Sequence, residues 1–211
     1  MAEYLIQDTT LTAIADAIRA RANITGALTP EEFATAIESI PDYLALRANN
    51  DTPFSYHSEE VKRLYNDTFG GSNQIESVSV PNCKQIQWRA LNSCSRLTSV
   101  YAPNALSIES GSFSGSSALP RLKLPSASSI YDSAFKNCTA LAILVLGRTD
   151  NIVELRNINA FAGTPIESGT GYVYVPSALV DTYKADSVWS TYANQIRAIE
   201  DYPDIVEGWD S

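Results

Sequence analysis

The chain has 211 residues, of which 45% are hydrophobic and 18% charged, and its formal net charge at pH 7 is −9. This composition is typical of folded globular proteins and excludes a wholly disordered chain. The acidic balance, with no run of Lys or Arg, argues against nucleic acid as a partner. No apolar stretch approaches the ~18 residues of a membrane-spanning helix, so we expect no membrane insertion.

The first 40 residues carry the pattern of two short amphipathic helices. Leu11 and Ile18 lie on one apolar helical face. The run 29–32, Thr-Pro-Glu-Glu, is typical of a helix start, with a capping Thr and Pro at the first helical position. Two short helices bury too little surface to be stable alone. We therefore predict a helical attachment or oligomerisation segment over 1–40 and a linker over 41–52.

A repeat with a period of 22 residues covers 53–176, with an insertion of about four residues after Gly147. Each unit reads Leu-x-x-Val-x-Val-Pro, which predicts a half-buried strand that a proline ends. One unit cannot bury its own apolar side, so the units must stack as a solenoid. The predicted inward columns are Ile75, Leu97, Leu119 and Leu141; Val78, Val100, Leu122 and Leu144; and Ile86, Ile108, Ile130 and Ile152.

The three cysteines, Cys83, Cys94 and Cys138, show no Cys-x-x-Cys spacing. This argues against a disulfide framework or a zinc site and favours buried small side chains.

The segment after Pro176 has helical spacing. Ser177 suits a helix N-cap, and Leu179, Tyr183 and Trp189 continue an apolar face. We predict a helical C-terminal cap over 177–199, with a short strand near Ile196, and a loose acidic tail over 200–211.

The segments LTSVYAPNALSIESGSFSGSSA and LPRLKLPSASSIYDSAFKNCTA resemble the unit of BspA-like leucine-rich repeat proteins. Cys94 and Cys138 fall in the cysteine column of that unit, whereas Ser116 stands in the same column of its own repeat. The resemblance implies an α/β repeat fold: a leucine-rich-repeat (BspA-like) solenoid of 22-residue units with a parallel sheet. A small α-helical N-terminal segment precedes the solenoid in this prediction, and the helical cap closes it.

The run LTAIADAIRARANITGALTPEEFATAIESI resembles the N-terminal segment of many phage tail-associated proteins. The resemblance implies that residues 1–40 attach the chain to other tail or virion proteins and that the solenoid lies distally. A homotrimer is expected by the same resemblance.

Catalytic chemistry finds little support in the sequence. His57 is the only histidine, so every His-dependent catalytic or metal site would need it. No P-loop, His-Glu-x-x-His or Gly-x-Ser-x-Gly motif occurs. The carboxylate pairs Glu31–Glu32 and Glu59–Glu60 suit helix starts or a cap better than glycoside hydrolysis. We expect no catalytic residue, no metal site and no cofactor.

The remaining place for function is the outward face of the predicted sheet. The candidate binding strip consists of Ser79, Tyr101, Arg121, Lys123, Ile143 and Val145. Apolar Ile143 and Val145, where polar residues are expected, indicate either a contact patch or a cover by the inserted loop 148–158.

The favoured function is a non-enzymatic phage tail or baseplate protein whose solenoid presents a host-receptor or protein-binding surface. Its partners would be virion proteins through residues 1–40 and a bacterial surface protein or glycan through the solenoid. Its location would be the virion tail, after synthesis in the bacterial cytoplasm. The alternative is a BspA-like adhesin on the bacterial cell surface, against which the lack of a signal-peptide pattern in MAEYLIQDTT counts.

Overall fold

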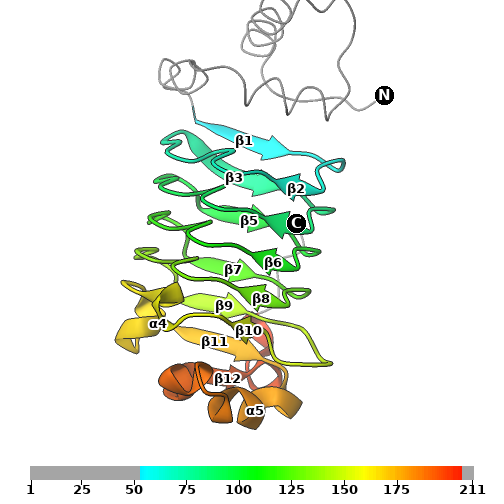
Figure 1. The fold of residues 1–211 in the computed structure, drawn as a ribbon, viewed down its shortest axis with the longest axis vertical. Helices are drawn as coiled ribbons and strands as arrows, with labels where there is room; N and C mark the ends of the chain where they lie inside the picture. Colours follow the sequence, from blue (N-terminus) through cyan, green and yellow to red (C-terminus); the bar gives the residue numbers. More distant parts are fainter. Residues whose placement is uncertain (1–52, 206–211) are drawn as a thin grey trace, which may run out of the picture. The chain divides into compact units, whose positions relative to one another are not determined.

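The computed structural model describes residues 53–205, which belong to one compact unit of the chain. The predicted segment 1–40, the predicted linker 41–52 and residues 206–211 of the predicted tail 200–211 lie outside the described residues. Within the described part, no helix has the length and apolar character needed to cross a membrane. Figure 1 shows successive coils of this unit stacked along one axis.

Two sheets run along the stack, and every neighbouring pair of strands is parallel. The larger sheet has seven strands in the order β1 (Phe54–His57), β3 (Ile75–Ser79), β5 (Ser99–Tyr101), β7 (Arg121–Lys123), β9 (Ile143–Val145), β11 (Tyr172–Val175) and β12 (Ile196–Ala198). The smaller has five strands, β2 (Arg63–Leu64), β4 (Gln85–Ile86), β6 (Ser107–Ile108), β8 (Ser129–Ile130) and β10 (Glu154–Leu155). The predicted parallel sheet is confirmed, and a second, narrower sheet accompanies it.

The strand register joins like positions of neighbouring coils. Ser77 pairs with Ser99, and Leu122 with Leu144, each 22 positions further along the chain. Because paired residues send their side chains to the same side, apolar columns of the sequence become columns of the core. Leu144, for example, is completely buried.

The insertion after Gly147 displaces one predicted column. Ile130 pairs with Leu155, which is 4% exposed, so Leu155 and not Ile152 occupies the inward column. Ile152 is only partly buried at the margin of the core. The prediction for Ile152 is wrong because the extra residues come before this strand, and a fixed count of 22 therefore ends too early.

A stack of aromatic rings links the later coils to the C-terminal segment. The ring centroids of Phe113 and Phe135 are 5.4 Å apart, and those of Phe135 and Phe161 are 5.5 Å apart. Trp189 and Tyr192 then contact Phe161 at 5.8 and 5.3 Å. Each such pair contributes about 0.5–1.5 kcal/mol beyond the burial of its surface.

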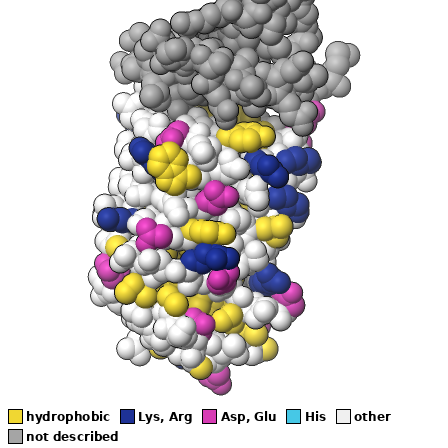
Figure 2. Space-filling model, in the orientation of Figure 1, with side chains coloured by type: hydrophobic (Ala, Val, Ile, Leu, Met, Phe, Trp, Pro, Cys, Tyr) yellow, Lys and Arg dark blue, Asp and Glu magenta, His cyan; other side chains and the backbone are white. Residues whose placement is uncertain are grey.

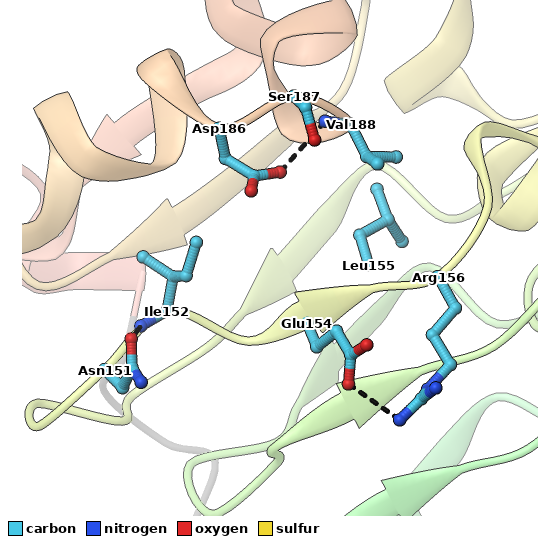
Figure 3. A pocket seen from close by; sticks show the side chains of 8 residues that line it. All are labelled: Asn151, Ile152, Glu154, Leu155, Arg156, Asp186, Ser187 and Val188. Carbon is cyan, nitrogen blue, oxygen red and sulfur yellow. Dashed lines mark hydrogen bonds and ion pairs between the residues drawn. The ribbon is translucent and has the colours of Figure 1, made fainter.

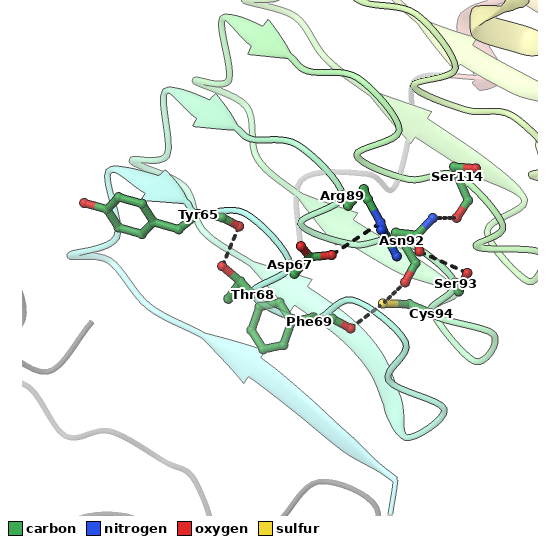
Figure 4. A network of polar contacts seen from close by, with 9 residues as sticks. All are labelled: Tyr65, Asp67, Thr68, Phe69, Arg89, Asn92, Ser93, Cys94 and Ser114. Carbon is green, nitrogen blue, oxygen red and sulfur yellow. Dashed lines mark hydrogen bonds and ion pairs between the residues drawn. The ribbon is translucent and has the colours of Figure 1, made fainter. Parts of the chain in front are cut away.

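Four successive coils each turn at two residues in the left-handed backbone region, and the next coil does so at Gly163. The two columns are Asp67, Arg89, Gly111 and Ser133, and Gly71, Ser93, Gly115, Asn137 and Gly163, with φ between 53° and 77°. A residue with a β-carbon costs about 1–2 kcal/mol in this region, whereas glycine does not. Figure 4 shows the polar contacts around these turns, including Arg89 Nε at 3.4 Å from Asp67 Oδ1.

The cysteine column supplies hydrogen-bond donors to the core. Cys83, Cys94 and Cys138 are free and buried, which confirms the prediction of buried small side chains. The thiols of Cys94 and Cys138 each donate to a backbone carbonyl oxygen 25 residues earlier, at 3.1 and 3.0 Å. Ser116 plays the same part, donating to the Leu91 carbonyl oxygen at 2.5 Å and accepting from the Cys94 N–H at 3.1 Å. Burial raises the pKa of Cys138 to about 12.

Short helices surround the last two strands of the larger sheet. The 3-10 helices are η1 (Ile158–Phe161), η2 (Ser177–Leu179), η3 (Trp189–Gln195), η4 (Ile199–Asp201) and η5 (Pro203–Ile205), and the α-helices are α4 (Pro165–Ser168) and α5 (Val180–Ala185). Strand β12 confirms the strand predicted near Ile196. The predicted N-cap at Ser177 is wrong, because Ser177 is the first residue of η2 and its N–H donates to the Glu200 carboxylate.

The C-terminal segment is fixed to the inserted loop by two side chains that bond one backbone residue. The Tyr183 hydroxyl accepts from the Val153 N–H at 2.8 Å. The Trp189 indole N–H donates to the Val153 carbonyl oxygen at 2.7 Å. Both side chains are completely buried, so these bonds form in a region with little competing water.

Candidate binding surface

The outward side chains of the seven-stranded sheet form two rows that cross its strands. Neighbouring strands lie about 4.8 Å apart, so a row of seven positions spans about 29 Å. The first row is His57, Ser79, Tyr101, Lys123, Val145, Tyr174 and Arg197, and the second row is Ser55, Ser77, Ser99, Arg121, Ile143 and Tyr172.

The strip predicted from the sequence lies on these two rows. The first row holds Ser79, Tyr101, Lys123 and Val145, and the second row holds Arg121 and Ile143. Five of these side chains are exposed or partly exposed, but Val145 is only 1% exposed. Val145 is therefore wrong as an accessible binding residue.

The C-terminal segment covers the end of the sheet where Val145 lies. Tyr174, which pairs with Val145 on the neighbouring strand, is 4% exposed. The ring of Tyr202, between η4 and η5, lies 5.4 Å from the Tyr174 ring. The burial of Val145 argues against an open contact patch at that position, whereas Ile143 stays partly exposed.

The same end of the sheet supplies residues that the sequence strip did not include. Tyr172 lies beside Ile143 in the second row, and the guanidinium of Arg197 lies 4.6 Å from the Tyr172 ring centroid. The alternation Tyr-Val-Tyr-Val could have revealed Tyr172, because Val173 and Val175 fill inward positions. Arg197 carries no repeat signal, because β12 follows the last repeat.

The two rows differ in charge from the rest of the chain. His57, Arg121, Lys123 and Arg197 are the ionisable basic groups in them, and neither of these described rows contains a carboxylate. The net charge of the chain is nevertheless −9. The face seen in Figure 2 mixes acidic, basic and apolar side chains. Cations beside tyrosine rings suit contact with a polar or acidic partner surface.

Burial changes the pKa of one tyrosine in the first row. It raises the pKa of Tyr174, and the neighbouring Tyr202 and Tyr172 act in the same direction. The Tyr174 hydroxyl therefore stays neutral across the physiological range and does not add an acidic charge to the basic rows.

His57 and Ser79 of the first row, together with the nearby Glu59, have the residue types of a hydrolase triad but lack its shielding from water. His57 Nδ1 lies 2.9 Å from Ser79 Oγ, and His57 Nε2 lies 3.6 Å from Glu59 Oε1. The side chains of His57 and Glu59 are 61% and 64% exposed, so nothing excludes water from the histidine. His57 is thus a surface residue, as predicted. Glu60 is also exposed, and Glu31–Glu32 lies outside the described residues.

Metal-binding residues do not gather elsewhere in the part of the chain that the structure describes. No group of three His, Cys, Asp or Glu side chains in 53–205 has the arrangement of a metal site. The buried thiols are already engaged as donors to backbone carbonyls.

Comparison with known proteins identifies the repeat. The family model described as the BspA type leucine rich repeat region matches residues 33–169 in six copies, more than half of the chain. No curated protein matches the sequence.

Proposed function

Because the chain belongs to the BspA type leucine rich repeat family, we propose that it is a binding protein whose larger sheet presents the contact surface. Repeats of this family serve as protein-interaction scaffolds rather than as catalytic frameworks. The observation that carries the proposal is the pair of outward rows, where cations and tyrosines gather on an otherwise acidic chain. The cover removes Val145 and Tyr174 from the accessible surface and leaves the other members of the two rows exposed or partly exposed.

More specifically, we propose that the chain is a structural protein of a phage tail or baseplate. Its support is the resemblance of residues 1–40 to attachment segments of tail-associated proteins, which would leave the solenoid free to meet a host receptor or a neighbouring protein. A homotrimer would present three such surfaces and so strengthen weak individual contacts. The alternative is a bacterial surface adhesin, which would use the same face of the repeats.

We also propose that residues 177–205 serve as the C-terminal cap of the 22-residue repeats. A solenoid exposes its core at each end unless another segment closes it. The buried rings of Trp189 and Tyr192 pack against Phe161, the last phenylalanine of the ring stack, and so cover that end of the core.

Immunogold electron microscopy of induced phage particles, with antibody to this chain, separates the two locations. The tail proposal predicts gold at the tail tip or baseplate, and it fails if gold is absent from the particles. Gold on the envelope of uninduced bacteria would instead support the adhesin. Light scattering on the full chain tests the trimer, which requires three times the mass of one chain.

A further inference from the structure

Within the described residues 53–205, the smaller sheet ends at an edge strand, β10, whose outer side pairs with no further strand. Along this sheet one column of carbonyl oxygens accepts from the N–H groups of the next coil, each at 2.9 Å: Leu64 from Gln87, Ile86 from Glu109, Ile108 from Tyr131 and Ile130 from Arg156. The next member of the column is Leu155, on the edge strand β10. Because Leu155 pairs with Ile130, whose carbonyl oxygen faces β10, the N–H and carbonyl oxygen of Leu155 face away from β8, on a side where residues 53–205 supply no further strand of this sheet.

In the neighbouring column of carbonyl oxygens, the last member accepts from a side chain. There the carbonyl oxygens of Lys62, Lys84, Leu106 and Ser128 accept from the next coil, and the Val153 carbonyl oxygen accepts from the Trp189 indole. Residues 177–205 therefore complete one acceptor column of the sheet and leave the other open at Leu155. The outward-facing peptide groups of an edge strand are a template for pairing with another chain, so this position is suited to an extended peptide.

Leu155 lies in a groove between the inserted loop and the turn 186–188 (Figure 3). The groove has a volume of about 490 Å³, within the range of ligand sites. Its apolar part is made by Ile152, Leu155 and Val188, and its polar rim by Glu154, Arg156 and Asp186 among others.

The walls of the groove are held in place. Asp186 Oδ1 accepts from the N–H groups of Val188 and Trp189, both at 3.0 Å, which fixes the turn. On the opposite wall Arg156 bonds Glu154 at 2.8 Å and lies over the Tyr131 ring at 4.7 Å. One wall is the turn 186–188, which follows the last repeat, and the other carries β10 and the inserted residues before it, so the groove lies where the inserted loop meets the C-terminal segment.

We propose that this groove binds an extended peptide segment of a partner protein, which pairs with β10 as a further strand of the smaller sheet. A strand supplies both an N–H and a carbonyl oxygen to one opposite residue, which matches the outward-facing groups of Leu155. An apolar side chain of the segment would lie on Ile152 and Val188, and a basic one would meet the carboxylate of Asp186. This site is separate from the two rows of the larger sheet, and it does not depend on the tail assignment.

An array of acetylated and amidated random hexapeptides, probed with the full chain, tests the site. Ser187→Trp places a large ring on the exposed rim of the groove, and Thr191→Trp adds the same ring to the same segment away from the lining residues. We expect the native chain and T191W to bind a common set of peptides, and S187W to bind them at least tenfold more weakly. Equal far-UV circular dichroism and melting temperatures of the two variants would show that S187W is folded.

A second measurement tests strand pairing itself and needs no variant of the protein. Saturation with the tightest peptide should slow amide hydrogen exchange of Leu155 at least tenfold, and N-methylation of alternate peptide nitrogens should weaken binding at least tenfold. The proposal is overturned by the absence of peptide binding. It is equally overturned by full affinity of the N-methylated peptide, or by unchanged exchange of Leu155 in the complex.

Discussion

Replacing Ser116 tests how the core of the solenoid satisfies its backbone. The Ser116 hydroxyl bridges two buried groups, the carbonyl oxygen of Leu91 and the N–H of Cys94. In Ser116→Ala both groups lose this partner. In Ser116→Cys the thiol can donate to the Leu91 carbonyl oxygen, as the Cys138 thiol donates in its own coil.

The expected losses follow from these contacts. A buried polar group left without a partner costs about 1–3 kcal/mol, and the Cys94 N–H can recover part of this by approaching the Leu91 carbonyl. We therefore expect S116A to lower the free energy of unfolding by about 2 kcal/mol. S116C keeps a donor of suitable shape, so its loss should stay below about 1 kcal/mol.

Urea unfolding followed by far-UV circular dichroism measures both variants against the native chain. The slope of free energy against urea should be unchanged, so that the shift of the midpoint reports stability. Equal stability of S116A and the native chain would refute the bridging role. A cysteine variant as unstable as the alanine variant would refute the equivalence of serine and cysteine in this column.

Three further predictions address the turns, the C-terminal segment and the thiols. Gly163→Ala, at a φ of 75°, should cost about 1–2 kcal/mol in urea unfolding, since the exposed Asn137 side chain, whose Oδ1 would lie 2.5 Å from the new β-carbon, can move aside. Gly71→Ala, with a φ of 76° and no atom within 4 Å, should cost about the same, and a loss below about 0.5 kcal/mol at both positions would contradict the argument from the backbone. Tyr183→Phe removes the acceptor of a buried N–H and should cost about 1–2 kcal/mol in the same assay; a loss below about 0.5 kcal/mol would show that this bond is unimportant. Burial raises the pKa of the Cys138 thiol from about 9 to about 12, so its contribution to stability is complete below pH 9 and is lost as the pH rises toward 12. Stability that rises over this alkaline range, or rapid reaction of the folded chain with a disulfide reagent at neutral pH, would contradict the burial of the thiol.

The regular part of the fold could be predicted because each coil repeats the same solution. The columns that contain Leu122 and Ile108 were identified from spacing alone, since a stacked coil buries the same position in every unit. The left-handed turns were harder to find. Arg89 and Ser93 adopt the backbone conformation of Gly111 and Gly115, so no single residue type marks these columns.

The inserted loop and the C-terminal segment could not be predicted from the sequence, because their contacts join residues that are far apart along the chain. The extra residues before β10 moved Leu155 into the column assigned to Ile152. Tyr174, which pairs with Val145, meets Tyr202 of a segment that folds back over the sheet. The groove wall at 186–188 likewise comes from a segment without a repeat signal.

The central claim is that the outward rows of the larger sheet form the contact surface of the chain. A photo-crosslinking residue at Tyr101, in the first row, tests this on particles or cells that carry the full chain. The matched control replaces Trp88, which is 44% exposed and follows β4 of the smaller sheet. The account predicts a crosslinked partner from position 101 and none from position 88. No adduct at 101, or equal adducts at both positions, would contradict it.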